Sequence, residues 1–274
     1  MLRRQLVIFV LMIFVPTIFA STIFHTRDLK ESHMMIPDKE TGVRVAQWTK
    51  EMNVNPEELG SYYQGDIILT HNTQRSGVTD KELFWPNGEV PYVIEGDFNK
   101  AQRDLILKTI CQYHEYTCIR FVPKTEETTN YIAITSNNTG CHSNVGMKGG
   151  RQIVNLQIPG CVTKIGTVEH EFMHCLGCWH EHTRWDRDNY VTINTTNIEQ
   201  KHMGNFVKDN PNSNSYYGTK YNYNSIMHYS RTAFTKNGED TIIPNNTKAE
   251  IGQREGFSEP DLQLINTMYC KKSC

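Results

Sequence analysis

The most informative part of the sequence is the stretch Thr167–Asp188, TVEHEFMHCLGCWHEHTRWDRD. Its spacing HExxHxxGxxH is formed by His170, Glu171, His174, Gly177 and His180. Residues four apart lie on one face of a helix, so the first two histidines can bind the same metal ion. Gly177 permits the positive φ that ends a helix at little steric cost. The chain can therefore turn there and bring His180 back as a third ligand.

Three histidines in this arrangement indicate a catalytic zinc ion. Neutral imidazole is a good zinc ligand, and three protein ligands leave the fourth tetrahedral position open for chemistry. Glu171 follows the first ligand directly on the helix, where it can reach a water bound to the metal. HExxH alone occurs by chance among ordinary polar helix residues, but the added glycine and third histidine favour the catalytic site.

Length, charge and the first residues limit the class of protein. The 274 residues suffice for one large domain or two small ones, and a net charge of −2 gives no case for nucleic acid or an anionic membrane. Residues 1–20 place two arginines before an apolar run that ends in small residues. This pattern predicts a secretory signal peptide cut near Ala20, with a signal anchor as the alternative. No later stretch is apolar enough to span a bilayer, so we expect a secreted protein without a membrane span.

The cysteines and sequons fit an extracellular protein. An even number of cysteines in a secreted chain predicts disulfides. The eight all lie beyond residue 110: Cys111, Cys118, Cys141, Cys161, Cys175, Cys178, Cys270 and Cys274. Sequons for N-glycosylation begin at Asn137, Asn194 and Asn245.

Residues 21–75 are polar and free of cysteine, and they suit a linker, a pro-segment or a small accessory domain. Asn55 before Pro56 predicts the start of a short helix. Arg75 offers a basic cleavage point directly before Ser76.

Downstream, the pattern changes to alternating strands and helices. Hydrophobic periodicity predicts strands over 89–94, 118–122, 131–135 and 152–158. It predicts a helix that Asp97 or Asn99 can cap and that runs to about Tyr116, a second from 164–167 onward, and a third over 259–268. Between residue 190 and the last helix the chain is rich in Asn, Tyr, Ser and Gly and reads as irregular. The strand over 152–158 is expected either to form a sheet edge that pairs with an extended peptide substrate or to be an ordinary structural strand.

Two motifs make the chain similar to the astacin family of metalloproteases, within the metzincins. Residues 170–187 match the family's zinc signature HExxHxxGxxHExxRxDR, and SIMHY at residues 225–229 resembles its Met-turn. Residues 117–123, TCIRFVP, and 63–66, YQGD, are similar to further family segments, the second to the FxGD latency motif. The resemblance implies an α+β, metzincin-type fold: a twisted mixed five-stranded sheet, long helices, an irregular C-terminal subdomain and an active-site cleft between. It also implies a signal peptide over 1–20, a pro-segment over 21–75 and a catalytic domain over 76–274.

By this resemblance the chain is a secreted zinc-dependent endopeptidase that acts on protein or peptide substrates and is made as a latent zymogen, which an activating protease cleaves. The implied roles are zinc binding by His170, His174 and His180, general base and acid at Glu171, an apolar floor at Met227, and zinc blockade by Asp66. The resemblance also implies that Tyr229 is a fifth, displaceable zinc ligand, which moves to stabilise the transition state. Cleavage after Arg75 would create a new N-terminus at Ser76, whose amino group would be buried against Glu181.

The family also implies a disulfide Cys141–Cys161 and another from Cys118 to the C-terminus. We expect Cys118–Cys274 with Cys111–Cys270, and leave open the exchange Cys118–Cys270 with Cys111–Cys274. Cys175 and Cys178 fall at variable positions of the zinc motif. A local disulfide that braces Gly177 is the favoured reading, and a metal-binding or redox pair is the alternative.

Two other classes of protein compete with this interpretation. A secreted binding protein built on an inactive protease scaffold would not need Glu171 and all three histidines. A zinc peptidase of the thermolysin type takes its third ligand from a distant glutamate, which Gly177 and His180 argue against.

Overall fold

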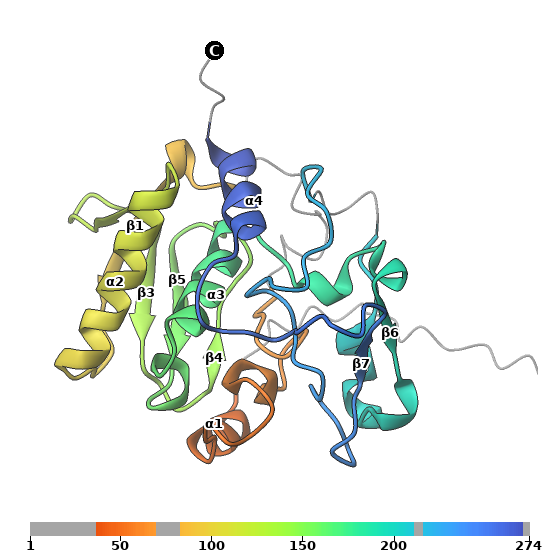
Figure 1. Ribbon diagram of the computed structural model, residues 1–274. Coiled ribbons are helices and arrows are strands. Elements are labelled where there is room, and N and C mark those ends of the chain that lie inside the picture. Colours follow the sequence, from red (N-terminus) through yellow and green to blue (C-terminus); the bar gives the residue numbers. More distant parts are fainter. Residues whose placement is uncertain (1–36, 70–82, 211–215, 271–274) are drawn as a thin grey trace, which may run out of the picture. The chain divides into compact units, whose positions relative to one another are not determined.

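The computed structural model describes residues 37–69, 83–210 and 216–270, and its upstream half is organised around one mixed sheet (Figure 1). The strands are β1 Glu89–Ile94, β2 Arg120–Pro123, β3 Tyr131–Thr135, β4 Cys141–His142 and β5 Arg151–Leu156. They lie in the order β2-β1-β3-β5-β4. All neighbours are parallel except β4, which is antiparallel to β5. The expected mixed five-stranded sheet is confirmed.

Strand β5 is not at the edge of this sheet, because β4 lies beside it and forms the last strand on that side. Asn155 and Leu156 of β5 pair with His142 and Cys141. The hypothesis that residues 152–158 form the edge is therefore wrong, and the ordinary structural strand is the correct alternative. Alternation along a strand reports which face is buried, and it carries no information about which strand lies beside it.

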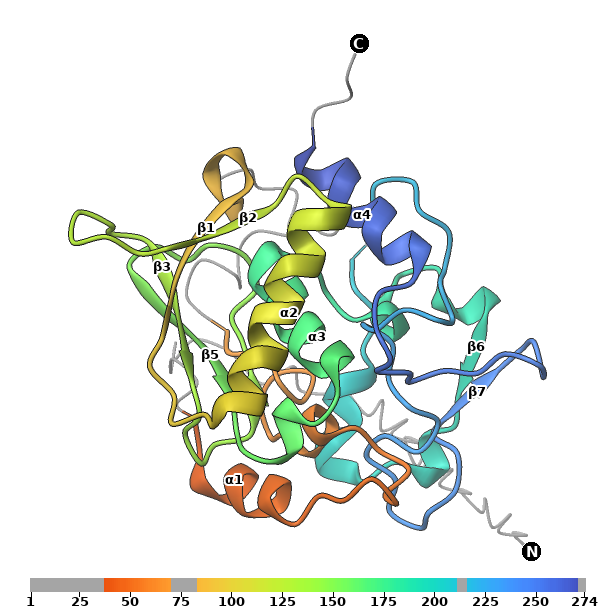
Figure 2. The same ribbon diagram turned by 60° about the vertical axis from the view of Figure 1, so that its left-hand side comes forward.

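Within the described residues, four α-helices accompany the sheet: α1 Lys39–Ala46, α2 Lys100–Tyr116, α3 Ile165–Leu176 and α4 Glu259–Tyr269. Asn99 caps α2 by accepting a hydrogen bond from the amide of Gln102, whose side chain accepts one from the amide of Asn99. Figure 2 shows α2 and α3 side by side over the sheet, and the two helices are in contact. None of the described helices is long and apolar enough to cross a bilayer.

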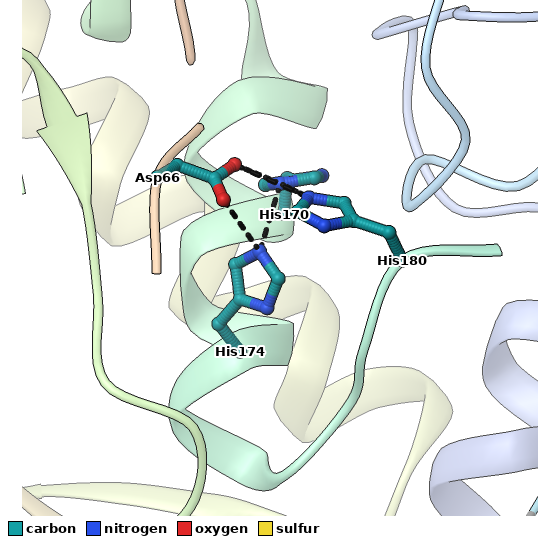
Figure 3. Close-up of side chains that lie close together, drawn as sticks. All are labelled: Asp66, His170, His174 and His180. Atoms are coloured by element: carbon teal, nitrogen blue, oxygen red, sulfur yellow. Dashed lines mark hydrogen bonds and ion pairs between the residues drawn. The ribbon is translucent and has the colours of Figure 1, made fainter. Parts of the chain in front are cut away.

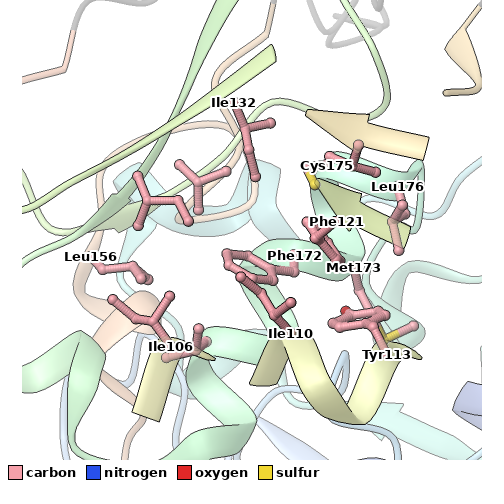
Figure 4. Packing of buried hydrophobic residues seen from close by; sticks show 14 of the residues in the cluster. Ile106, Ile110, Tyr113, Phe121, Ile132, Leu156, Phe172, Met173, Cys175 and Leu176 are labelled. Atoms are coloured by element: carbon pink, nitrogen blue, oxygen red, sulfur yellow. The ribbon is translucent and has the colours of Figure 1, made fainter. Parts of the chain in front are cut away.

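An apolar core joins these two helices to the sheet (Figure 4). Helix α2 contributes Ile106, Ile110 and Tyr113, and helix α3 contributes Phe172 and Met173. All five side chains are buried. Burying one such side chain stabilises the fold by about 1.5–3 kcal/mol. The helix that carries the first two histidines is thus fixed by apolar packing on its opposite face.

The second half of the chain is irregular, as predicted. Its only described sheet pairs β6 Val191–Ile193 with β7 Ile242–Pro244 in antiparallel fashion. Short 3-10 helices supply most of the remaining order across the protein: η1 Pro56–Leu59, η3 Pro86–Gly88, η4 Gly160–Val162, η5 Glu181–Thr183, η6 Arg187–Asn189, η7 Thr195–Asn197 and η8 Gln200–Phe206. A second buried cluster, rich in aromatic rings, forms around Phe206, Tyr229 and Phe234. Packing of large rings replaces regular secondary structure in this half.

Two disulfides cross-link the described residues, Cys141–Cys161 and Cys118–Cys270. The preferred pairing of Cys118 with Cys274 and of Cys111 with Cys270 is wrong, and the alternative Cys118–Cys270 holds. Helix α4 ends next to α2, where the side-chain amide of Asn266 donates to the carbonyl of Tyr116, so Cys270 is brought to Cys118. Sequence spacing contains no information on this approach. Cys111 forms no disulfide with a described residue, and Cys274 lies outside the described residues.

The expected disulfide between Cys175 and Cys178 is also wrong. Both thiols are free and buried. Cys175 lies in the last turn of α3 within the core, and the sulfur of Cys178 contacts the sulfur of Met268 at 3.8 Å. Burial raises the pKa of each thiol, which suppresses the thiolate that redox or metal chemistry requires. The pair therefore packs as two small apolar side chains.

Candidate metal centre

Helix α3 and the turn after it bring the three predicted histidines together (Figure 3). Gly177 adopts φ 108° at the end of the helix, as expected, and its amide donates to the carbonyl of His174 at 2.8 Å. The amide of Cys178 donates to the carbonyl of Met173 at 3.0 Å. These are the bonds of a left-handed glycine cap, and they redirect the chain so that His180 faces the helix.

The imidazole Nε2 atoms converge on one point. Nε2 of His170 lies 3.1 Å from Nε2 of His174 and 3.3 Å from Nε2 of His180. The carboxylate of Asp66 is the fourth member, at 2.9 Å from His170, 3.5 Å from His174 and 3.3 Å from His180. All four side chains are fully buried.

These separations suit a tetrahedral zinc ion. Zinc bonds to nitrogen and oxygen of about 2.0–2.1 Å separate neighbouring ligand atoms by about 3.3–3.4 Å, which is close to the distances found here. Oδ1 of Asp66 is buried without a hydrogen-bond partner among the described residues, as expected of an oxygen that faces a metal. Among those residues this cluster alone groups three or more side chains able to hold a metal.

Asp66 reaches the centre from residues 37–69, which we call the upstream segment. A tight turn closes between Tyr62 and Gly65, and the glycine has φ 87°. A Cβ at this glycine would lie 3.0 Å from the ring of Phe234 and 3.3 Å from the hydroxyl of Tyr229. Only glycine fits both the conformation and the space, so the turn requires it.

The upstream segment also pairs with the sheet edge beyond β4. The amide of Ser143 donates to the carbonyl of Asp66 at 3.0 Å, and the amide of Ile68 donates to the carbonyl of Ser143 at 2.8 Å. The side-chain amide of Asn144 donates to the carbonyl of Ile68 at 2.6 Å. The segment thus lies as a short parallel extension of the sheet at the metal centre.

Glu171 is buried beside the cluster, and neither of its carboxylate oxygens has a hydrogen-bond partner among the described residues. Burial, with repulsion from Asp66 as a further cause, raises the pKa of its carboxyl well above the ordinary value. A carboxyl of this kind can accept and return a proton, which is the task of a general base and acid.

Residues 225–229 contact the site through backbone carbonyls and the hydroxyl of Tyr229. The carbonyl of Ile226 accepts a hydrogen bond from Nδ1 of His170 at 2.7 Å, and the carbonyl of Met227 accepts one from the amide of Glu181 at 2.9 Å. Met227 is buried in the apolar core, and its role as a floor beneath the metal stays a prediction. The hydroxyl of Tyr229 donates to the backbone carbonyl of Gln64.

Glu181 is buried, and its Oε1 accepts from the amide of Asn222 at 2.7 Å and from Arg184 at 3.4 Å. Burial raises the pKa of this carboxyl to about 8. Its expected partner, the amino group of Ser76, and the cleavage residue Arg75 lie outside the described residues.

Several residues around the site escaped the sequence reasoning. Glu57 forms an ion pair with Arg254, and both side chains are fully buried. Glu58 accepts a hydrogen bond from the amide of Ser230 at 2.7 Å. Gln64 contacts His180 through its side chain. The acidic pair read only as the first turn of a short helix. No local signal marked Arg254 or Ser230 as its partners, or Gln64 as the partner of His180.

Comparison with known proteins agrees with this geometry. Residues 77–270 match the family model described as Astacin (Peptidase family M12A). The chain is 41% identical over 214 residues to zinc metalloproteinase nas-7 of Caenorhabditis elegans, covering 78% of this chain and 55% of that protein. It is 39% identical over 229 residues to seminal metalloprotease 1 of Drosophila melanogaster, covering 80% and 90%. The chain spans about half the length of the nematode relatives it matches.

A solved structure supports the same conclusion. High choriolytic enzyme 1, a hatching-enzyme zinc protease of the medaka Oryzias latipes, superposes with a TM-score of 0.64 at 40% identity, covering 69% of this chain and 96% of that one. A family model that matches most of the chain, together with relatives of this identity, is sufficient evidence of descent. The chain belongs to the astacin family of zinc metalloproteinases, peptidase family M12A.

Proposed function

We propose that this protein is the latent precursor of a zinc endopeptidase, in which the upstream segment blocks the metal until it is removed. The observation that carries the proposal is the fully buried cluster of His170, His174, His180 and Asp66. Beside it lies the carboxyl of Glu171, which has no hydrogen-bond partner in the described part of the chain. Three ligands come from the catalytic part of the chain and one from the removable part. Such a centre is complete as a metal site but closed to substrate.

The catalytic residues act on a peptide bond as follows. Zinc in this centre would lower the pKa of a bound water to about 7 and polarise the scissile carbonyl. Glu171 takes the proton from the attacking water and returns it to the leaving amine. Tyr229, once its hydroxyl is released from the carbonyl of Gln64, donates a hydrogen bond to the developing oxyanion.

Latency is supported by the path of the upstream segment. The backbone of Asp66 and Ile68 occupies the hydrogen-bonding groups of Ser143 at the sheet edge, where an extended peptide substrate would pair. The carboxylate of Asp66 meanwhile takes the coordination position that water needs. Cleavage after Arg75 then frees both places at once, and the new amino group of Ser76 is expected to pair with the buried carboxyl of Glu181.

Extracellular action is part of the proposal. Two disulfides persist in an oxidising compartment, and the apolar start of the chain suits a signal peptide. Asn137 and Asn245 are exposed and Asn194 is half-buried, so Asn137 and Asn245 are the better glycan acceptors.

The test is controlled activation of the full-length precursor. Treatment with a trypsin-like protease should release an active form whose N-terminal sequence is SGVTD, with cleavage of a denatured protein substrate that a zinc chelator stops and added zinc restores. A Glu171→Ala precursor, processed in parallel, controls for activity of the added protease. Full activity of the uncut precursor, or an active form with another N-terminus, would contradict the proposal.

A further inference from the structure

The three histidines of the metal centre differ in what holds their outer ring nitrogen. Nδ1 of His170 donates to the carbonyl of Ile226 at 2.7 Å, and Nδ1 of His174 donates to the carbonyl of Cys178 at 2.8 Å. Both acceptors are backbone groups of the catalytic part of the chain. Nδ1 of His180 instead donates to the side-chain oxygen of Gln64 at 2.9 Å, 116 residues away on the upstream segment.

This difference matters because each ring must carry its proton on Nδ1. The Nε2 atoms face one another and the carboxylate of Asp66, so they are the metal-binding nitrogens. The outer partner of a metal-bound histidine fixes its tautomer and orientation, and its loss typically weakens metal binding about 10–100-fold. His180 and Gln64 are both buried, so no bulk water replaces a lost acceptor while the upstream segment is in place.

The backbone also makes His180 the ligand most dependent on its outer partner. The other two histidines stand on α3, whose far face is packed into the core. His180 lies after the helix, held by the contact of the Thr183 hydroxyl with its carbonyl at 2.9 Å and by ring packing against Tyr229 at 4.8 Å. Neither contact fixes rotation of the imidazole about its own axis, whereas a hydrogen bond to Nδ1 does.

We propose that Gln64 is a positioning residue that completes the outer shell of His180, so that the upstream segment holds the zinc site together as well as covering it. The inference rests on the proposed zinc centre. Removing the upstream segment then withdraws the outer acceptor from one zinc ligand and leaves the other two intact. The precursor retains zinc more firmly than the blocking carboxylate alone would achieve, and His180 is the ligand through which zinc first loosens after activation.

The experiment compares zinc release from intact precursors that all keep Asp66. Stopped-flow mixing with a chromogenic zinc chelator measures the release rate without any peptidase activity. Gln64→Leu keeps the approximate size of the side chain but has no acceptor, and it should release zinc about 10–100-fold faster than the wild type. Gln64→Glu supplies a charged acceptor to Nδ1 and should release zinc more slowly than the wild type.

Ser61→Ala provides the matched control. Its hydroxyl contacts Arg44 on α1 within the same segment, away from the histidines, so its release rate should equal that of the wild type. Zinc release that is fastest from Gln64→Leu, intermediate from the wild type and slowest from Gln64→Glu supports the inference. A merely structural disturbance would accelerate release from both variants. Equal rates, or faster release from both, would overturn it. A wild-type precursor that binds no stoichiometric zinc would instead remove the proposed function itself.

Discussion

Helix α3 and the upstream segment both reach the candidate metal centre, and their contacts near it differ in kind. Phe172, Met173 and Leu176 anchor α3 in the apolar core and are fully buried (Figure 4). The upstream segment also buries apolar side chains such as Val45 and Ile67, but its contacts with the centre itself are polar, above all those of Gln64 and Asp66. Apolar packing is non-directional and permanent, whereas hydrogen bonds specify one fit and are replaced by water on release.

The buried ion pair of Glu57 and Arg254 shows the same principle on the side of the upstream segment. A buried pair recovers little net free energy, because the desolvation of two charges offsets their attraction. Loss of one partner is costly, since the other charge then remains buried alone. Such a contact selects one docked position of the segment, and it adds little to the free energy needed to remove the segment.

The largest expected effect is on catalysis and concerns Glu171 on helix α3. Glu171→Ala should lower the activity of the cleaved form on the order of 10²–10⁴-fold, because we propose that this residue moves the proton as general base and acid. The melting temperature and the zinc content should stay near those of the wild type, since the side chain is not among the proposed ligands and no described residue forms a hydrogen bond with it. Retained activity in a sample free of wild-type protein would refute the assignment.

The next effect concerns the apolar anchor of α3. Phe172→Ala should destabilise the precursor by about 3–5 kcal/mol through lost burial and the cavity left behind, as measured by urea unfolding. Leu107→Ala on α2 is the matched control, because that side chain is 41% exposed and should cost far less. Equal costs for the two changes would mean that the core does not anchor the helix.

On the polar side, Asp66→Ala should give the uncut precursor measurable peptidase activity, because the open coordination position then accepts water. The activity should remain below that of the cleaved form, since Gln64, Glu57 and the pairing at Ser143 still hold the segment in place. Assays of uncut precursors on a short fluorogenic peptide measure the difference. A silent Asp66→Ala precursor that still binds zinc would show that backbone pairing alone maintains latency.

The smallest effect is the pH dependence of the buried carboxyl of Glu57. Burial raises its pKa from 4.5 to about 7, against the opposing pull of Arg254. A raised pKa means that the docked state favours the protonated carboxyl, so this contribution to stability is complete below about pH 4.5 and is lost as the pH rises through 7. Glu57→Gln stays neutral at every pH, and its melting temperature relative to wild type should therefore rise between pH 5 and pH 8.

Thermal unfolding of both precursors across that range measures the effect. The comparison with the neutral variant removes the contributions of the other buried carboxyls, which the two proteins share. A difference that falls with rising pH would mean that the ion pair with Arg254 outweighs the desolvation of Glu57.

Local patterns predicted the regular elements well. The strand Glu89–Ile94 and the helices α2, α3 and α4 were expected within one to three residues of their ends, because hydrophobic periodicity and capping residues act over a few positions. Predictions failed where a partner far along the chain decides the outcome. Cys118 pairs with Cys270, β4 rather than β5 forms the sheet edge, and Cys175 packs in the core without a disulfide.

The sequence by itself predicted that three histidines and Glu171 belong to one zinc site, because their spacing on a helix with a glycine end leaves little other geometry. It also indicated Asp66 through its resemblance to a family motif. Only the tertiary structure decided which groups surround the site, namely Gln64 at His180 and Arg254 at Glu57. Helical spacing is a local property of the backbone, whereas buried polar groups must find partners wherever the fold brings a complementary atom within hydrogen-bond distance.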